Sequence, residues 1–103
     1  MRAKTRVKIA RTYLVDDGFD VSYVADDGTI REPTGKTKSV SVCIIRSPNA
    51  QYCHDVLMYC GSEGDSLIIE SRDNNHIALE YIMKISECIF ENMPKTRLTI
   101  RYI

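Results

Sequence analysis

An amphipathic stripe between residues 75 and 91 constrains this chain more than any other feature. Apolar residues recur there at spacings of three and four, which is the period of a helix with one buried face. The stripe consists of Ala78, Tyr81, Ile82, Ile85, Cys88 and Ile89. Asp73 or Asn74 can cap the start of the helix, and Pro94 ends it. The rest of the chain must therefore supply the surface that buries this stripe.

The segments around the helix have the alternation and the β-branched or aromatic residues that are typical of strands. They lie at about 39–45, 52–60, 66–71 and 97–103. Turn-forming residues separate the first three, at 46–49 and 61–65. Residues 39–103 therefore predict the order β-β-β-α-β.

The first third of the chain also has a strand-like pattern. Residues 5–14 and 19–24 alternate, and each segment is followed by Asp-Asp-Gly, at 16–18 and 26–28. Asp-Gly favours the positive φ angles of a tight hairpin turn. We therefore predict a β-meander or hairpin arm over residues 1–32.

These segments together predict one α+β domain over residues 1–103. A polar loop, Glu32–Lys38, joins the arm to the β-β-β-α-β part. The expected architecture is an antiparallel-rich sheet with one long helix on one face. The length of 103 residues is near the commonest domain size.

Composition excludes some classes of function. Fourteen basic and fourteen acidic residues give a formal net charge of zero, so charge does not favour nucleic acid or an anionic membrane. No apolar run approaches the ~18 residues that are needed to cross a bilayer. We expect a cytoplasmic protein without membrane association.

The cysteines and histidines were considered as metal ligands. The cysteines are Cys43, Cys53, Cys60 and Cys88, each with apolar neighbours, which predicts reduced and partly buried thiols. Cys53, His54, Cys60 and His76 match no zinc spacing, and strand alternation would point Cys53 and His54 apart. We predict no metal site and no cofactor.

The segment Asp-Asn-Asn-His-Ile-Ala-Leu at 73–79 resembles the Thr-Asn-Asn-x-x-Glu-Leu segment that begins the first helix of ribonuclease H. The element order over 39–103 is similar to the first half of that fold. The resemblance implies two metal ions held by carboxylates from the first strand, the first helix and the fourth strand. Those positions fall near Arg46, at Ala78, and near Arg101 or Tyr102. The resemblance therefore implies the scaffold without the hydrolase, and we predict that the chain is not an enzyme.

HicB-type antitoxins offer a second, more distant resemblance. Gly64-Asp65 followed by a helix that contains Ala78 is similar to their Gly-Asp…Glu-Ala-Leu pattern, although the acidic-Ala pair is absent. This resemblance implies a non-catalytic role in binding a partner.

The N-terminus is basic. Its cationic residues are Arg2, Lys4, Arg6, Lys8 and Arg11, and the first four alternate, so a strand would place them on one face. They form either a face for phosphates or an acidic partner, or an edge that charge guards against aggregation. No aromatic residue interleaves them for stacking on bases.

The last strand predicts self-association. Leu98, Ile100 and Tyr102 lie in a strand with no later segment to cover its edge, and such an edge pairs readily with an identical strand. We predict a homodimer that is a non-enzymatic protein-interaction module with a protein partner. Its small size suggests a viral or mobile-element accessory or inhibitor protein. The alternative is a nucleic-acid-binding protein that uses the basic N-terminal strand.

Overall fold

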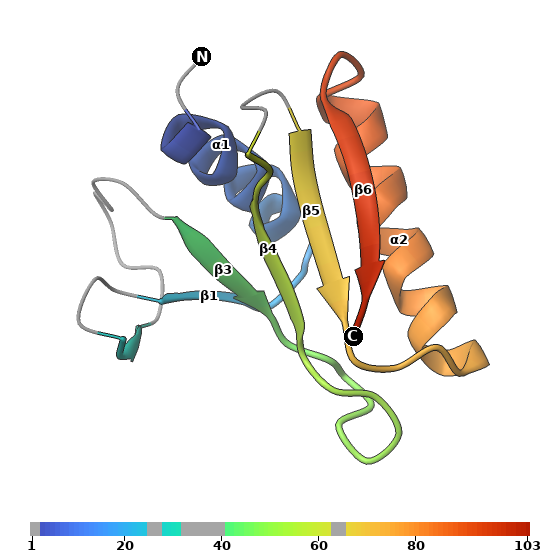
Figure 1. Cartoon of the computed structure of the whole chain (residues 1–103). Helices are drawn as coiled ribbons and strands as arrows, with labels where there is room; N and C mark the ends of the chain where they lie inside the picture. The colour runs from blue at the N-terminus through green and yellow to red at the C-terminus, as the bar shows by residue number, and fades with distance from the viewer. Residues whose placement is uncertain (1–2, 25–27, 32–40, 63–65) are drawn as a thin grey trace.

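The structure is a computed structural model that describes residues 3–24, 28–31, 41–62 and 66–103. One layer is a six-stranded sheet, and both helices lie on one of its faces (Figure 1). The helices are α1 (Ala3–Asp16) and α2 (His76–Asn92). The strands are β1 (Val21–Val24), β2 (Ile30–Arg31), β3 (Val42–Ile45), β4 (Val56–Cys60), β5 (Ser66–Ser71) and β6 (Arg97–Tyr102).

The sheet order is β2-β1-β3-β4-β5-β6. All neighbouring strands are antiparallel except β5 and β6, which are parallel because α2 connects them. The predicted α+β class with an antiparallel-rich sheet is confirmed. The predicted β-β-β-α-β order after residue 39 is also confirmed, although β4 begins at Val56 rather than at residue 52.

The core lies between the sheet and the two helices. Cys43, Met58 and Ile69 face one another across β3, β4 and β5 and are fully buried. The predicted stripe of α2 is buried against the same face, and Ile82 and Ile89 are among its members. The alternation of buried and half-buried residues along β5 shows that its other face is left open by the helices.

The prediction of a strand over residues 5–14 is wrong, because this segment belongs to α1. Val7, Ala10 and Leu14 are spaced by three and four, and all three are fully buried on the sheet. The segment contains no glycine or proline, and half of its residues are Ala, Arg, Lys or Leu, which favour helix. The predicted β-meander arm over 1–32 is therefore a helix followed by a hairpin.

The first Asp-Asp-Gly motif ends α1 instead of turning a hairpin. The Gly18 N–H donates to Val15 O and the Phe19 N–H donates to Leu14 O, both at 3.0 Å. This is the Schellman arrangement, and Gly18 has the positive φ of 97° that it needs. The positive φ at this glycine, which predicted a hairpin turn, therefore ends a helix instead.

The glycine of the second Asp-Asp-Gly motif has the positive φ that was predicted, and it lies between two paired strands. Gly28 has a φ of 83°, and β1 and β2 on either side of it pair antiparallel. Residues 25–27 and the predicted loop Glu32–Lys38 lie outside the described residues.

The start of α2 differs slightly from the prediction. Asn75 is the N-cap, since its side chain accepts a hydrogen bond from the Ala78 N–H at 3.0 Å. Asp73 and Asn74, which were expected as caps, precede it. The boundary moved by one residue, while the type and face of the helix were predicted correctly.

Candidate interaction surface

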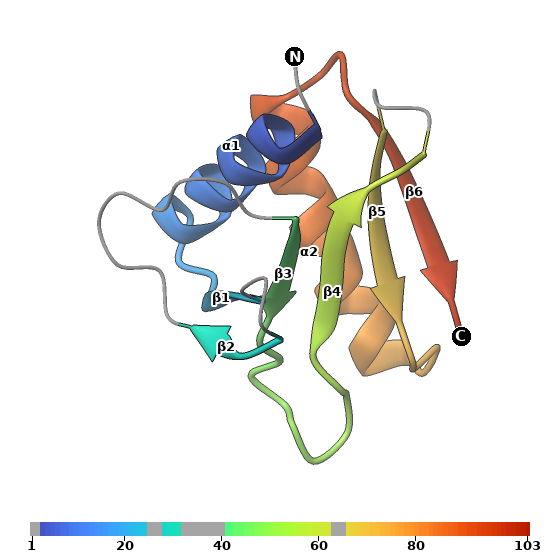
Figure 2. The same ribbon diagram turned by 60° about the vertical axis from the view of Figure 1, so that its left-hand side comes forward.

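The edge of the sheet at β6 is the most distinctive surface of the molecule. β6 is the outermost strand in both views, and no described strand lies beyond it (Figures 1 and 2). An uncovered edge presents backbone N–H and C=O groups that can pair with another strand. Pro or Lys within an edge strand would hinder such pairing, and β6 contains neither.

The pairing of β6 with β5 fixes which backbone groups are available. The Ile103 N–H donates to Ser71 O at 3.0 Å, so residue 103 turns its backbone groups toward β5. Backbone direction alternates along a strand, which places the N–H and C=O of Leu98, Ile100 and Tyr102 on the outer side. These are the residues that the sequence predicted at a dimer edge, and their backbone groups point out from it.

The side chains of these residues point to the helix face. Leu98 is paired with Leu67 and packs against the core, and Ile100 and Tyr102 follow it at the same side-chain period of two. Ile100 is 39% exposed and Tyr102 is 47% exposed. The edge strand therefore shows apolar side chains that its own helices do not cover.

One flank of α2 adds further apolar side chains. Leu79, Met83 and Phe90 are 40%, 60% and 52% exposed, and their spacing of four and seven residues places them along one line of the helix. The opposite flank faces α1, since the Cys88 thiol donates to Tyr13 O at 3.6 Å. The exposed flank therefore faces away from α1, on the side where the sheet ends at β6. We call Leu79, Met83, Phe90, Ile100 and Tyr102 the β6-edge surface.

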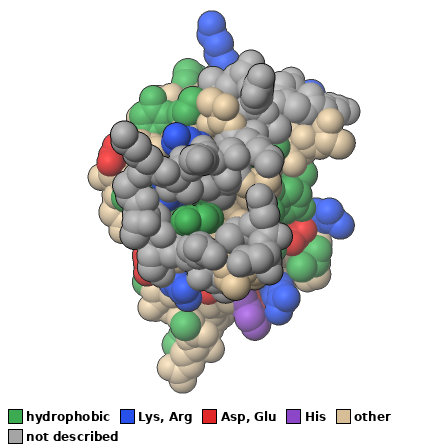
Figure 3. Space-filling model, turned by 90° about the vertical axis from the view of Figure 1, so that its left-hand side faces the viewer, with side chains coloured by type: hydrophobic (Ala, Val, Ile, Leu, Met, Phe, Trp, Pro, Cys, Tyr) green, Lys and Arg blue, Asp and Glu red, His purple; other side chains and the backbone are tan. Residues whose placement is uncertain are grey.

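Exposed apolar side chains are concentrated here. Among the described residues, eight large hydrophobic side chains are exposed, and six of them belong to α2 or to the chain from β6 onward. The other two are Val15 and Tyr52. Figure 3 views the opposite end of the sheet, where the described hydrophobic side chains are separated by polar, charged or undescribed residues. Single exposed apolar residues are ordinary, whereas a contiguous group marks an interaction surface.

The sequence predicted two of the five residues of this surface. Ile100 and Tyr102 were identified from the final strand, but Leu79, Met83 and Phe90 were missed. The available signal was that these three residues are apolar yet lie outside the buried stripe. Their position beside β6 depends on how α2 packs, which the sequence pattern does not specify.

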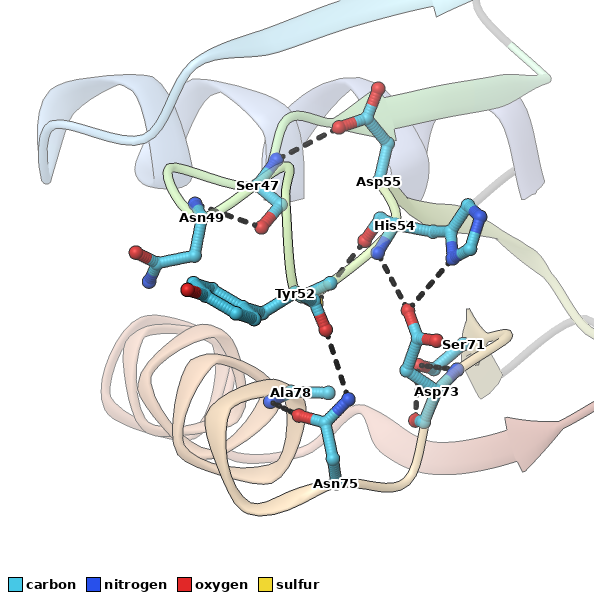
Figure 4. Close-up of polar contacts among 10 residues, drawn as sticks. Ser47, Asn49, Tyr52, His54, Asp55, Ser71, Asp73, Asn75 and Ala78 are labelled. Atoms are coloured by element: carbon cyan, nitrogen blue, oxygen red, sulfur yellow. Dashed lines mark hydrogen bonds and ion pairs between the residues drawn. The ribbon is translucent and has the colours of Figure 1, made fainter.

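A second group of residues gathers where the β3–β4 connection meets the start of α2 (Figure 4). His54 donates from its backbone N–H to Asp73 Oδ2 at 2.6 Å, and its ring Nδ1 lies 3.0 Å from the same oxygen. The Asn75 side chain donates to Tyr52 O at 2.9 Å. These contacts bind two long connections to each other, so they hold the helix start against the sheet.

The His54–Asp73 pair has a structural explanation. The backbone and ring of His54 donate to Asp73 and hold the pKa of that carboxyl below its ordinary value. Cys53, the neighbouring thiol, donates to His54 O at 3.3 Å instead of facing the ring. The histidine is thus oriented by a carboxylate, but Cys53 is not placed for it to activate as a nucleophile.

A pocket lies beside this group. It has a volume of about 360 Å³ and is lined in part by Asp17, Asp20, Arg46 and Tyr81. The Tyr81 hydroxyl donates to Arg46 O, and burial together with nearby Asp55 and other negative groups raises its pKa to about 12. The tyrosine is therefore neutral and engaged in holding the β3–β4 connection, as expected of a structural residue.

The cysteines are free thiols, as predicted. Burial raises the pKa of Cys43 to about 12 and that of Cys88 to about 11, and it also raises the pKa of Cys60. Cys53 lies in the connection before β4, not in a strand as predicted. No group of three or more His, Cys, Asp or Glu side chains among the described residues could hold a metal ion.

The basic N-terminal residues do not form the predicted strand face. Arg6 and Arg11 are buried beside the apolar stripe of α1, and Lys8 is exposed. Arg2 and the side chain of Lys4 lie outside what the structure describes. The interpretation of these residues as one cationic face of a strand is wrong, because a helix turns Arg6 and Lys8 to opposite sides.

The positions implied by ribonuclease H do not converge. Arg46 follows β3 and Tyr102 ends β6, with β4 and β5 between them. Three strand spacings separate β3 from β6 by about 14 Å. Ala78 is buried in α2. In the described part of the chain, these positions supply neither carboxylates nor a common centre for two metals.

Three comparisons were made with known proteins. Neither family models, nor curated proteins, nor solved structures gave a match to this chain. Within the described residues, no helix is both long and apolar enough to cross a membrane.

Proposed function

We propose that this chain is a non-enzymatic protein-interaction module that forms a homodimer through its β6-edge surface. The observation that supports the proposal is the concentration of exposed apolar side chains beside an unpaired strand edge. Such an edge pairs readily with an identical strand across a two-fold axis.

Burial of the β6-edge surface supplies part of the free energy that a dimer needs. Full burial of a large apolar side chain stabilises by about 1.5–3 kcal/mol, so each half-exposed member of the surface contributes roughly 1 kcal/mol. Two copies of five side chains then contribute on the order of 10 kcal/mol. The association cost is roughly 4–15 kcal/mol, so a stable dimer also needs the backbone hydrogen bonds of the paired edges.

Light scattering tests the proposal directly. The wild-type chain should have about twice the protomer mass of 11.8 kDa at micromolar concentration. Ile100→Lys should reduce the mass to that of the protomer, because it places a cation in the surface. Val15→Lys is the matched control, since Val15 is 41% exposed and lies on α1, outside the surface.

Two results would contradict the proposal. One is a wild-type mass near 11.8 kDa that stays unchanged on tenfold concentration. The other is a dimer that survives Ile100→Lys. The non-enzymatic part is tested separately, because EDTA-sensitive hydrolysis of an RNA–DNA hybrid by a well-purified sample would refute it.

A further inference from the structure

The direction of the β6 backbone restricts how two copies can pair. Only Leu98, Ile100 and Tyr102 turn N–H and C=O groups outward. In an antiparallel pair, outward-facing residues of one strand must lie opposite outward-facing residues of the other. The two-fold axis must therefore lie at one residue of β6, which then faces its own copy in the second chain. It cannot lie between two successive residues.

Charge disfavours two of the positions that remain. An axis at Thr99 would place Arg97 directly opposite Arg101 of the second copy. An axis at Arg101 would place two copies of that arginine opposite each other. Like charges directly across two strands are destabilising. Both arginines are exposed, and Arg101 also lies 3.8 Å from Glu70.

The three remaining axis positions differ in how many residues of β6 they pair. An axis at Leu98 pairs few residues of β6 and brings Lys95 opposite Arg101. An axis at Tyr102 pairs only the end of β6 with β6 of the second copy. An axis at Ile100 pairs the whole strand and places each Arg101 opposite Thr99.

We infer that two copies pair antiparallel through β6 with Ile100 on the two-fold axis. This inference rests on the proposed homodimer and specifies its register. On the helix face, Leu98 lies opposite Tyr102 of the second copy, and the two Ile100 side chains are direct neighbours. The three pairs formed by Leu98, Ile100 and Tyr102 each exchange two backbone hydrogen bonds.

The flank of α2 fits this arrangement. The side chains of β6 that meet across the axis point to the helix face, which is also where Leu79, Met83 and Phe90 are exposed. A two-fold axis beside β6 brings the two copies of this flank toward each other. The whole β6-edge surface is then covered by one symmetric contact.

Cysteine cross-linking distinguishes the registers. In the inferred register the Cα atoms of the two copies of residue 100 lie about 5.5 Å apart, within the range for a disulfide. Ile100→Cys should therefore cross-link to itself under mild oxidation. Thr99→Cys alone and Arg101→Cys alone should not, but a mixture of these two variants should. The mixture leaves Ile100 unchanged, so it tests the register even if Ile100→Cys weakens the dimer.

Two controls measure the cross-linking that does not depend on pairing of β6. Val15→Cys measures random collision, and the wild-type chain measures the contribution of its four native thiols. Cross-linking of Ile100→Cys should be on the order of a hundredfold faster than that of Val15→Cys, because paired thiols share a millimolar local concentration. Reduced variants are checked for dimer mass by light scattering.

The outcomes separate this inference from the proposed function. Self-cross-linking of Ile100→Cys together with cross-linking in the mixture supports the register. A dimer in which Thr99→Cys cross-links to itself, or in which no β6 variant cross-links, overturns the register and leaves the homodimer standing. A monomer at all accessible concentrations overturns both.

Discussion

A carboxylate at Ile82 should unfold the chain. Ile82 is 2% exposed and lies in the middle of the buried stripe of α2. Loss of a buried isoleucine side chain costs about 2–5 kcal/mol. An ionised carboxyl in its place adds about 4 kcal/mol or more, since burial shifts such a pKa by up to 3–5 units at 1.36 kcal/mol each. The sum is comparable to the ~5–15 kcal/mol that stabilises a domain.

Lys84→Asp provides the matched control in the same helix. Lys84 is exposed, so the change should cost only about 0.2–0.5 kcal/mol, from like-charge repulsion with Glu80 four residues earlier. Urea unfolding followed by circular dichroism should show a nearly normal midpoint for this variant. Ile82→Asp should show little or no folded baseline at pH 7.

The pH dependence of Ile82→Asp has a defined sign. Burial raises the folded pKa of the new carboxyl above its unfolded value of about 3.9. The variant is therefore least destabilised below about pH 4 and loses stability as the pH rises toward the folded pKa. Equal unfolding midpoints for Ile82→Asp and Lys84→Asp, or a destabilisation that does not change between pH 4 and pH 7, would show that the assigned helix face is wrong.

Three further predictions concern other parts of the molecule. Gly18→Ala should lower the free energy of unfolding by about 1–2 kcal/mol, because an L side chain is strained at positive φ, and Gly18→Asn should cost less; urea titration measures both. Cys43 and Cys88 should react slowly with iodoacetamide at pH 8 in the folded protein and quickly in urea, as mass spectrometry would show, because only the thiolate reacts. The difference in unfolding free energy between wild type and Asp73→Asn should shrink as the pH falls from 5 to 3. Hydrogen bonds from His54 lower the pKa of Asp73 in the folded protein. Their contribution to stability is therefore lost as the pH falls below 3.8, the ordinary pKa of this carboxyl.

Each of these predictions has a contrary outcome. Gly18→Ala as stable as wild type would contradict the Schellman geometry. Equal labelling rates of Cys43 in the folded and unfolded protein would contradict its burial. A difference at Asp73 that is constant down to pH 3 would mean that its contact with His54 does not stabilise the fold.

The sequence predicted the second half of the fold well because its pattern is long and consistent. The stripe runs along most of the 17 residues of α2, from Ala78 to Ile89, and the segment predicted as a strand at 66–71 has the same bounds as β5. Alternation alone placed the remaining strands within a few residues. Tertiary contacts were not needed to decide these elements.

The first helix was missed because its buried face contains arginines. Val7, Ala10 and Leu14 repeat at the helical period, but Arg6 and Arg11 lie beside them in the interior. Because arginine is rarely buried, the sequence pattern places Arg6 and Arg11 on an exposed face, and the segment then fits the alternation of a strand. Arg6 Nη1 is buried without a hydrogen-bond partner among the described residues, which is an arrangement that no sequence pattern would predict.

The edge of the sheet at β6 lacks the usual protection of an edge strand. Natural edge strands are usually guarded by Lys, Pro, bulges or a covering segment. The side chains of Arg97 and Arg101 belong to the open face of β6, where Arg101 lies 3.8 Å from Glu70. The apolar side chains of the strand instead face the side on which α2 exposes its own apolar flank. An unguarded edge or an apolar helix flank would mean little alone. Both occur on the same side of the same βαβ unit, so the proposed two-fold contact would cover both.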